Sequence, residues 1–188
     1  MSLKIGCLAW GSLVWDPRTL PRAGSFQADG PELPIEFSRV SLDGRVTLVI
    51  DANAPKLRTL WVELATSTLD EAVAALGRRE KIAPERWVDW VGRYRRGDRV
   101  RDETGPTDFD AWLETHRLDA VVWTALPSRT PTGELVVPRI EELLAHLAGL
   151  GSADRARAEQ YVRRAPRSVR TPHRARFESE LGWLPDGG

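Results

Sequence analysis

The sequence predicts an α+β fold, because strand-like segments dominate its first third and helical periodicity dominates the remainder. One further strand of the buried type, residues 119–126 (DAVVWTAL), returns late in the chain. With 188 residues, 41% of them hydrophobic, the chain has the length of one domain and enough apolar side chains to fill one core. We therefore expect a single domain over residues 1–188.

Four segments of the first third are predicted to be strands: 4–10, 35–42, 45–51 and 57–65. The first stops at Gly11, where Gly and Pro enter the sequence and a long loop begins. The second and third flank Asp43-Gly44, a pair typical of a type I′ turn because both residues tolerate positive φ. A β-hairpin is therefore expected between residues 35 and 51.

The remaining segments carry helix signals. Thr68 and Glu71 predict a capping box at the start of a helix that ends near residues 79–81. Trp87, Trp90, Val91 and Tyr94 follow at helical spacing, and a charged loop is expected at residues 93–108. Further helices are predicted from Thr107 or Asp108 through Leu113, at 138–150, at 152–165 with Ser152 as its cap, and from the cap Thr171, with Pro172 in its first turn, to Gly182.

Composition excludes several classes of protein. The 27 basic residues balance the 27 acidic ones, so no overall positive field favours nucleic acid or an anionic membrane. No apolar run approaches the roughly 20 residues of a membrane span. The single Cys7 excludes a disulfide framework and fits a reducing compartment, and the three His residues lack metal-ligand spacing. We expect a cytoplasmic protein without a metal site.

Eight Arg side chains are concentrated near the C-terminus. They could form a binding stripe for an acidic partner or nucleic acid, or simply the solvated face of two helices. The absence of interleaved stacking aromatics favours the solvated face. The eight are Arg155, Arg157, Arg163, Arg164, Arg167, Arg170, Arg174 and Arg176.

The tract AWGSLVWDP at residues 9–17 is the most unusual segment. A strand that ends in Gly-Ser-Leu directs consecutive backbone N–H groups into a sharp loop, which is the geometry of a small anion-binding nest. On local grounds the same residues could form an ordinary turn. The tract is therefore a candidate ligand-binding loop.

Three segments in order carry a family resemblance: this tract, then EFSRVSLDGR with VTLVI, then LRTLWVELATSTLDEAVAALGRRE. Together they resemble the gamma-glutamylcyclotransferase-like proteins, especially the glutathione-degrading branch. Trp10 stands where that family usually has Tyr, and KIAPERW replaces the Gly-Gly-Tyr that often follows its acid. The resemblance covers about the first 80 residues, and residues 119–126 resemble a later strand of the family's barrel.

The resemblance implies a small mixed β-barrel flanked by helices, with a family-specific helical insertion at 81–118 and a helical C-terminal part at 138–188. It puts the backbone of Gly11, Ser12 and Leu13 around the glutamyl group and Glu80 in the catalytic position. Residues implied to line the same pocket are Trp10, Arg39 and Ser41.

The implied reaction converts a γ-glutamyl substrate to 5-oxoproline, with Glu80 as general acid and base and no cofactor. Glu80 would face the pocket, whereas Arg78, Arg79 and Lys81 would face solvent. Two alternatives remain open: a binding protein for a γ-glutamyl compound or amino acid on the same fold, and an interaction protein that uses the Arg-rich C-terminal helices. Membrane and nucleic-acid partners are disfavoured, and homo-oligomerisation is left open.

Overall fold

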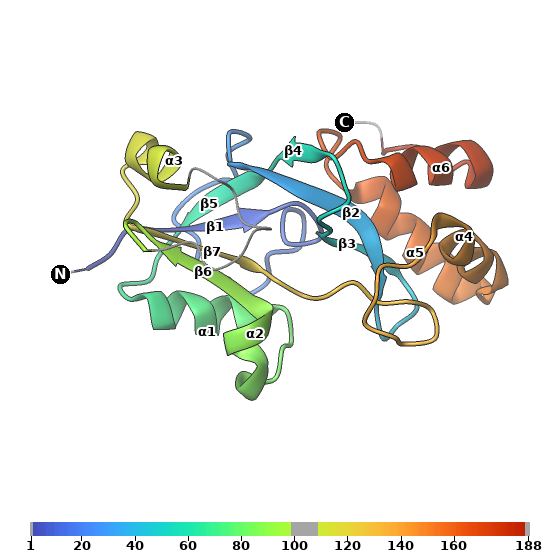
Figure 1. Ribbon diagram of the computed structural model, residues 1–188, viewed down its shortest axis with the longest axis horizontal. Coiled ribbons are helices and arrows are strands. Elements are labelled where there is room, and N and C mark those ends of the chain that lie inside the picture. The colour runs from blue at the N-terminus through green and yellow to red at the C-terminus, as the bar shows by residue number, and fades with distance from the viewer. Residues whose placement is uncertain (1, 99–108, 187–188) are drawn as a thin grey trace. The chain divides into compact units, whose positions relative to one another are not determined.

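The computed structural model describes residues 2–98 and 109–186, which fold as a mixed α+β structure in two compact units (Figure 1). Unit 1 is drawn from Met1–Ala9, Asp16–Leu33 and Arg58–Leu126. Unit 2 is drawn from Trp10–Trp15, Pro34–Leu57 and Pro127–Gly188. The two units are described separately.

Unit 1 is built on a four-stranded sheet with the order β5-β1-β7-β6. Its strands are β1 (Ile5–Ala9), β5 (Leu60–Leu64), β6 (Val91–Arg95) and β7 (Ala120–Thr124). Strand β1 pairs antiparallel with β5 and parallel with β7, and β6 runs antiparallel to β7. The apolar run that predicts β7 is explained by its central position, where Ala120, Val121 and Val122 are fully buried.

Helices cover this sheet on both faces (Figure 1). Helix α1 (Leu69–Arg79) packs on β6 and β7, and η1 (Pro84–Arg86) and α2 (Trp87–Trp90) follow it in the chain. Helix α3 (Phe109–His116) lies over the opposite face.

The predicted capping box at the start of α1 is confirmed, because Thr68 accepts from the Glu71 backbone N–H and the Glu71 carboxylate accepts from the Thr68 N–H. At the other end, the N–H of Lys81 donates to the carbonyl of Arg78, and the N–H of Ile82 donates to the carbonyl of Gly77. Lys81 has a φ of 57°, so the helix ends in a Schellman motif that uses a non-glycine left-handed residue. Both ends of α1 therefore follow from local hydrogen bonds.

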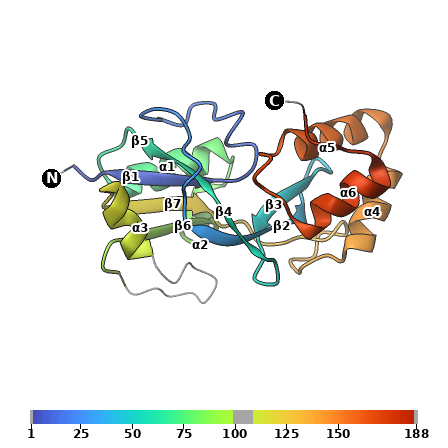
Figure 2. The same cartoon turned by 90° about the horizontal axis from the view of Figure 1, so that it is seen from above.

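The second sheet, with the order β3-β2-β4, lies mainly in unit 2. Its strands are β2 (Glu32–Val40), β3 (Val46–Ile50) and β4 (Lys56–Arg58). Helices α4 (Ile140–Gly149), α5 (Ser152–Arg164) and α6 (Pro172–Leu181) complete the unit, with α5 packed on β3 and α4 in contact with the other two helices (Figure 2).

The predicted caps of the C-terminal helices have different outcomes. Thr171 accepts from the backbone N–H of Arg174, and Gly182 has a left-handed φ of 71°, so both ends of α6 are confirmed. The cap of α5 is wrong by one residue, because Gly151 is the N-cap and Ser152 is the first helical residue. The predicted helix start at Thr107 or Asp108 lies outside the described residues.

The expected barrel is wrong: the described residues form two open sheets, with β5 and β6 at the edges of one and β3 and β4 at the edges of the other. The single strand predicted at 57–65 is interrupted at Thr59, whose N–H and hydroxyl both bond to the carbonyl of Pro31. The chain therefore passes from one sheet to the other instead of closing one sheet on itself.

The helical interpretation of Trp87 to Tyr94 is wrong beyond Trp90. Val91 begins strand β6, in which Tyr94 pairs with Val121. The tight approach of the Trp123 ring to Gly92 also belongs to this pairing. A short apolar segment fits either the helical or the strand period. Here the pairing with β7, a strand distant in sequence, makes the segment a strand.

The hairpin is confirmed, but its turn is not type I′, because Gly44 has a positive φ of 80° whereas Asp43 does not. The N–H of Gly44 donates to Ser41, and the N–H of Ser41 donates to Arg45. This is the pattern of a type I turn followed by a left-handed glycine, which makes a longer hairpin loop than the predicted one.

Candidate functional site

The predicted ligand loop at residues 10–13 belongs to unit 2. The indole N–H of Trp10 donates to the carbonyl of Leu48 at 3.3 Å, and the N–H of Val14 donates to that of Gly11 at 3.0 Å. Trp10, Gly11 and Leu13 are buried, whereas Ser12 is partly exposed. The loop is thus a tight turn fixed on β3, with Ser12 as its accessible residue.

Tyr161 of α5 packs directly against this loop. A Cβ atom added to Gly11 would lie 2.5 Å from the Tyr161 hydroxyl oxygen, which is well inside van der Waals contact. The same hydroxyl accepts from the backbone N–H of Leu48 at 3.4 Å. Gly11 is therefore required by a close approach, a role that its position in the sequence does not reveal.

Arg39 and Ser41, also in unit 2, have partners within the hairpin region. Arg39 donates to the carbonyl of Pro127 at 2.6 Å, and burial, with the nearby charge of Arg129, holds the pKa of Arg39 below its usual value. The Ser41 hydroxyl bonds to the Asp43 carboxylate and to the carbonyl of Arg45. Ser41 therefore organises the turn, while Arg39 is half-buried and retains further N–H donors.

Glu80, the predicted acid, is the C-cap residue of α1 in unit 1. Its carboxylate forms an ion pair of 2.6 Å with Arg79, and the two side chains are 17% and 3% exposed. The pKa of the Cys7 thiol in β1 is raised far above its usual range, mainly by burial and secondly by the negative charge of Glu80. Glu80 is thus a largely buried, charge-paired carboxylate.

The expectation that Arg79 faces solvent is wrong. Its guanidinium donates to Glu80 and to the backbone carbonyl of Asp16, and Arg18 caps the carbonyl of Arg79 itself at 3.4 Å. Arg78 and Lys81 are exposed, as expected. The last turn of α1 is packed so that the Arg79 and Glu80 side chains both point inward. Residue spacing alone does not predict this orientation.

The seven predicted site residues are divided between the units. Glu80 lies in unit 1, and unit 2 holds the other six, which are Trp10, Gly11, Ser12, Leu13, Arg39 and Ser41. Within unit 2, residues 10–13 and the strand β3 are joined directly by the Trp10 hydrogen bond to Leu48.

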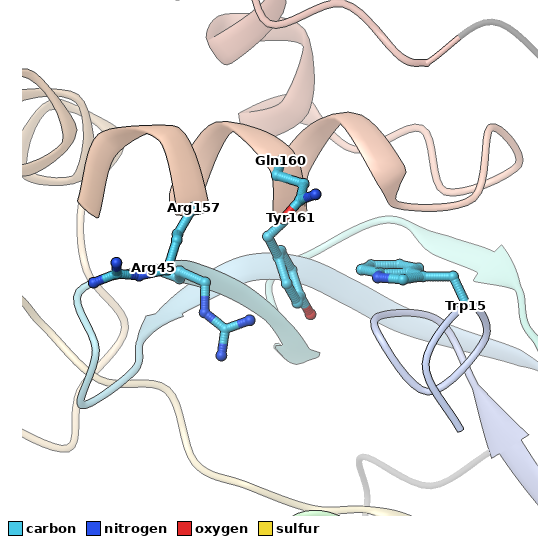
Figure 3. Close-up of a pocket in the computed structure, with 5 residues that line it drawn as sticks. All are labelled: Trp15, Arg45, Arg157, Gln160 and Tyr161. Carbon is cyan, nitrogen blue, oxygen red and sulfur yellow. The ribbon is translucent and has the colours of Figure 1, made fainter. Parts of the chain in front are cut away.

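Unit 2 also contains a small hollow of about 90 Å³ that the sequence does not predict (Figure 3). It is lined by Trp15, Arg45, Arg157, Gln160 and Tyr161. The Tyr161 ring has Trp15 on one side, at an edge-to-face centroid distance of 5.4 Å, and the Arg45 guanidinium on the other, at 5.5 Å. The available signal was the i, i+3, i+4 spacing on α5, which places three of these residues on one face.

A second polar cluster joins α3 to β5 in unit 1. The Asp29 carboxylate accepts from the indole N–H of Trp61 at 2.8 Å and contacts Nε2 of His116 at 3.1 Å. Nδ1 of His116 lies 2.8 Å from the carbonyl of Trp112. The hydrogen bonds from Trp61 and then His116 hold the pKa of Asp29 below its usual value. Both imidazole nitrogens of His116 have hydrogen-bond partners, so this cluster attaches α3 to the rest of unit 1.

Most of the C-terminal Arg side chains have partners within unit 2. Arg174 is buried and donates to the carbonyls of Ala165, Pro166 and Val169. The others with side-chain or carbonyl partners are Arg155 with Leu147, Arg157 with Asp154, Arg163 with Glu159 and Asp186, Arg167 with Asp186, and Arg176 with Glu180 and Glu141. Apart from the buried Arg174, these contacts fit the solvated helical face that the sequence favours better than a binding stripe.

Among residues 2–98 and 109–186, no group of three or more His, Cys, Asp or Glu side chains is arranged to hold a metal ion. The same part of the chain contains no helix with the length and apolar character needed to cross a membrane. Comparison with known proteins finds no protein-family model, curated protein or solved structure that matches this chain.

Proposed function

We propose that the chain is a gamma-glutamylcyclotransferase-like enzyme in which Glu80 is the general acid and base. The observation that supports this most is the largely buried ion pair of Glu80 with Arg79. Burial of two charges costs desolvation energy that their attraction does not reliably recover, so such a pair is weak as a stabilising device. The Glu80 carboxylate is therefore not part of an ordinary surface ion pair, which leaves room for a chemical role.

The proposed reaction needs no water, oxidant or cofactor. The free α-amine of the γ-glutamyl group attacks its own γ-carbonyl carbon, a new C–N bond forms, and the bond from that carbon to the leaving nitrogen breaks. Because the attack is intramolecular, orientation of the substrate removes about 7–11 kcal/mol of the barrier. The remaining task is proton transfer from the substrate ammonium to the departing amine.

Glu80 is proposed to carry this proton. As an anion it accepts a proton from the ammonium, which frees the amine to attack, and as the acid it passes this proton to the leaving nitrogen. A second proton, which the ring nitrogen loses once the new C–N bond has formed, takes the same route, so the ring nitrogen ends as an amide N–H and the amine leaves as an ammonium ion. Arg79 holds the carboxylate in a fixed position between the two steps, because the ion pair and the bond to the carbonyl of Asp16 fix the guanidinium at both ends.

The substrate-binding roles are assigned to residues of unit 2. The turn at Gly11, Ser12 and Leu13 is proposed to contact the glutamyl group through its backbone, with Trp10 as one wall. Arg39 is proposed to bind the α-carboxylate, since a half-buried guanidinium with one carbonyl partner retains donors for a bidentate contact.

The test is 5-oxoproline release from glutathione, γ-glutamyl amino acids and γ-glutamylamines, followed by NMR. Glu80→Gln preserves the shape of the side chain and is expected to reduce turnover by at least about 100-fold, the usual contribution of general acid–base catalysis. The matched control is Glu85→Gln, which changes an exposed carboxylate five residues further along. It should keep full activity.

Turnover retained by Glu80→Gln, with native circular dichroism, would contradict the role of this residue. Ligand-induced thermal stabilisation without product from any substrate would instead support the non-catalytic binding protein. If none of the compounds gives stabilisation or product, the γ-glutamyl substrate class itself is wrong.

A further inference from the structure

The hollow beside Tyr161 has the features of a binding site for a small anion and plays no part in the reaction proposed above. Its aromatic wall is rigid, because Tyr161 is buried, is held by the N–H of Leu48 and abuts Gly11. Trp15 packs edge-to-face against the Tyr161 ring. The guanidinium of Arg164 lies in turn 5.8 Å from the centroid of the Trp15 ring.

The polar groups of the hollow are predominantly hydrogen-bond donors. Arg45 directs its guanidinium along the Tyr161 ring, and Gln160 extends its amide from the adjacent position of α5 (Figure 3). Two nitrogen atoms of Arg45, Nε and Nη2, contact the same carboxylate oxygen of Asp43 at 2.8 Å. A guanidinium has five N–H groups, so Arg45 retains donors for a ligand.

The two guanidiniums that line the hollow, those of Arg45 and Arg157, are each paired with one carboxylate, Asp43 and Asp154. A third guanidinium, that of Arg164, lies against the Trp15 ring. Burial raises the pKa of Asp43, but hydrogen bonds from Arg45 and Ser41 outweigh it and hold the pKa below its usual value, so Asp43 is charged near neutral pH. The hollow thus offers guanidinium donors without a large excess of positive charge, which suits a monoanion better than a dianion.

The size of the hollow limits the bound group. The hollow has about 90 Å³, less than the roughly 150 Å³ of an enclosed cavity that accepts benzene. A group as small as a carboxylate with its adjoining carbon suits this volume.

We propose that the hollow formed by Trp15, Arg45, Gln160 and Tyr161 binds the carboxylate group of a small organic acid or amino acid. The planar guanidinium of Arg45 receives the two carboxylate oxygens, Gln160 donates from the side, and the Trp15 and Tyr161 rings contact the carbon that bears the carboxylate. The rest of the ligand extends into solvent through the open side of the hollow. This binding does not require Glu80 or any turnover.

The test is a titration of the uniformly ¹⁵N-labelled protein with acetate and with glutamate, followed through the indole N–H resonance of Trp15, which Trp15→Phe assigns. For such small probes we expect saturable shifts with dissociation constants of about the millimolar range. Sodium chloride at matched ionic strength corrects for screening, and inorganic phosphate tests the preference for a carboxylate over another oxyanion.

Arg45→Gln should weaken acetate binding roughly tenfold or more, because a charged hydrogen-bond pair is lost. Arg45→Lys keeps the charge without the planar fork and should give an intermediate affinity. The matched control is Arg176→Gln, which removes another partly exposed, carboxylate-paired guanidinium from α6 and should leave binding unchanged.

Three results would overturn the proposal: no saturable shift of the Trp15 resonance, a shift that chloride reproduces, or equal affinity in Arg45→Gln and the native chain. Tighter Arg45-dependent binding of phosphate than of acetate would refute the carboxylate class. If Arg45→Gln does not fold, the Arg45→Lys titration replaces it, and equal affinity of Arg45→Lys and the native chain for acetate would overturn the proposal. The acetate titration and its dependence on Arg45 do not involve 5-oxoproline release, so their failure leaves the proposed enzyme reaction untouched and the reverse also holds.

Discussion

The hydroxyl of Tyr161 lies so close to the backbone of Gly11 that a Cβ atom there would be 2.5 Å from the oxygen. The next nearest ring atom, Cζ, would be 3.5 Å away, which is an ordinary contact. One oxygen atom on α5 therefore determines that residue 11 is glycine, and it ties the predicted ligand loop to the hollow lined by Trp15 and Tyr161.

This relationship predicts a rescue. Gly11→Ala should destabilise the chain by about 1–3 kcal/mol through overpacking. Tyr161→Phe removes the clashing oxygen, so the double variant should regain most of that loss relative to Tyr161→Phe alone. Urea unfolding of the four proteins measures the coupling. Simple additivity of the two substitutions would show that the hydroxyl is not the obstacle.

The Arg79–Glu80 pair predicts a loss of stability when either charge is removed. Arg79→Met leaves the Glu80 carboxylate largely buried without its counter-charge, and Glu80→Gln removes the carboxylate partner of the more deeply buried Arg79 guanidinium, so each change should cost about 3 kcal/mol. A double-mutant cycle by chemical denaturation should give a coupling above about 1 kcal/mol. The control cycle on the exposed pair of Arg176 and Glu180 should stay within about 0.5 kcal/mol. Equal couplings would mean that the first pair behaves as a surface pair.

Asp29 predicts part of the acid sensitivity. Its folded-state pKa is depressed by hydrogen bonds from Trp61 and His116, so its contribution to stability is present above the unfolded value near 4 and is lost as the pH falls through the folded value. Asp29→Asn should therefore show a smaller loss of thermal stability between pH 7 and pH 3 than the native chain. Glu114→Gln, an exposed change on α3, is the control and should keep the native pH profile.

The contacts of the C-terminal Arg residues predict weak binding to polyanions. Arg163 is paired with Glu159 and Asp186, and Arg167 donates to the carbonyl of Asp186. The native chain should therefore pass a heparin column near physiological salt without retention. If it is retained, and the combined change of Arg163, Arg164 and Arg167 to Ala abolishes retention, the interaction-protein alternative gains support.

Local signals in the sequence sufficed for several elements. The capping box at Thr68, the cap at Thr171 with Gly182 beyond it, and the apolar strand at residues 120–124 all depend on neighbours within a few residues or on continuous burial. The hairpin was predicted by its turn residues, although the turn type was wrong because Asp43 keeps a negative φ. Hydrogen bonds between residues close in sequence can be predicted from residue type and spacing.

The candidate site was predictable only in part. The sequence singled out Glu80, but whether its Arg neighbours face inward depends on the packing of α1, which buries Arg79 with it. The hollow joins residues 15, 45, 157, 160 and 161, and the separation of the first two from the others leaves no local pattern. Residue spacing on α5 marks one face of the helix and does not say what that face contacts.

Local geometry and apolar content are enough to predict the α+β composition, the ends of the best-capped helices and the buried strand β7. Tertiary structure alone decided that residues 91–95 form a strand, that residues 57–65 divide between two open sheets, and that Gly11 adjoins Tyr161. Each of these is fixed by a partner distant in sequence, and such contacts form only when the whole chain packs.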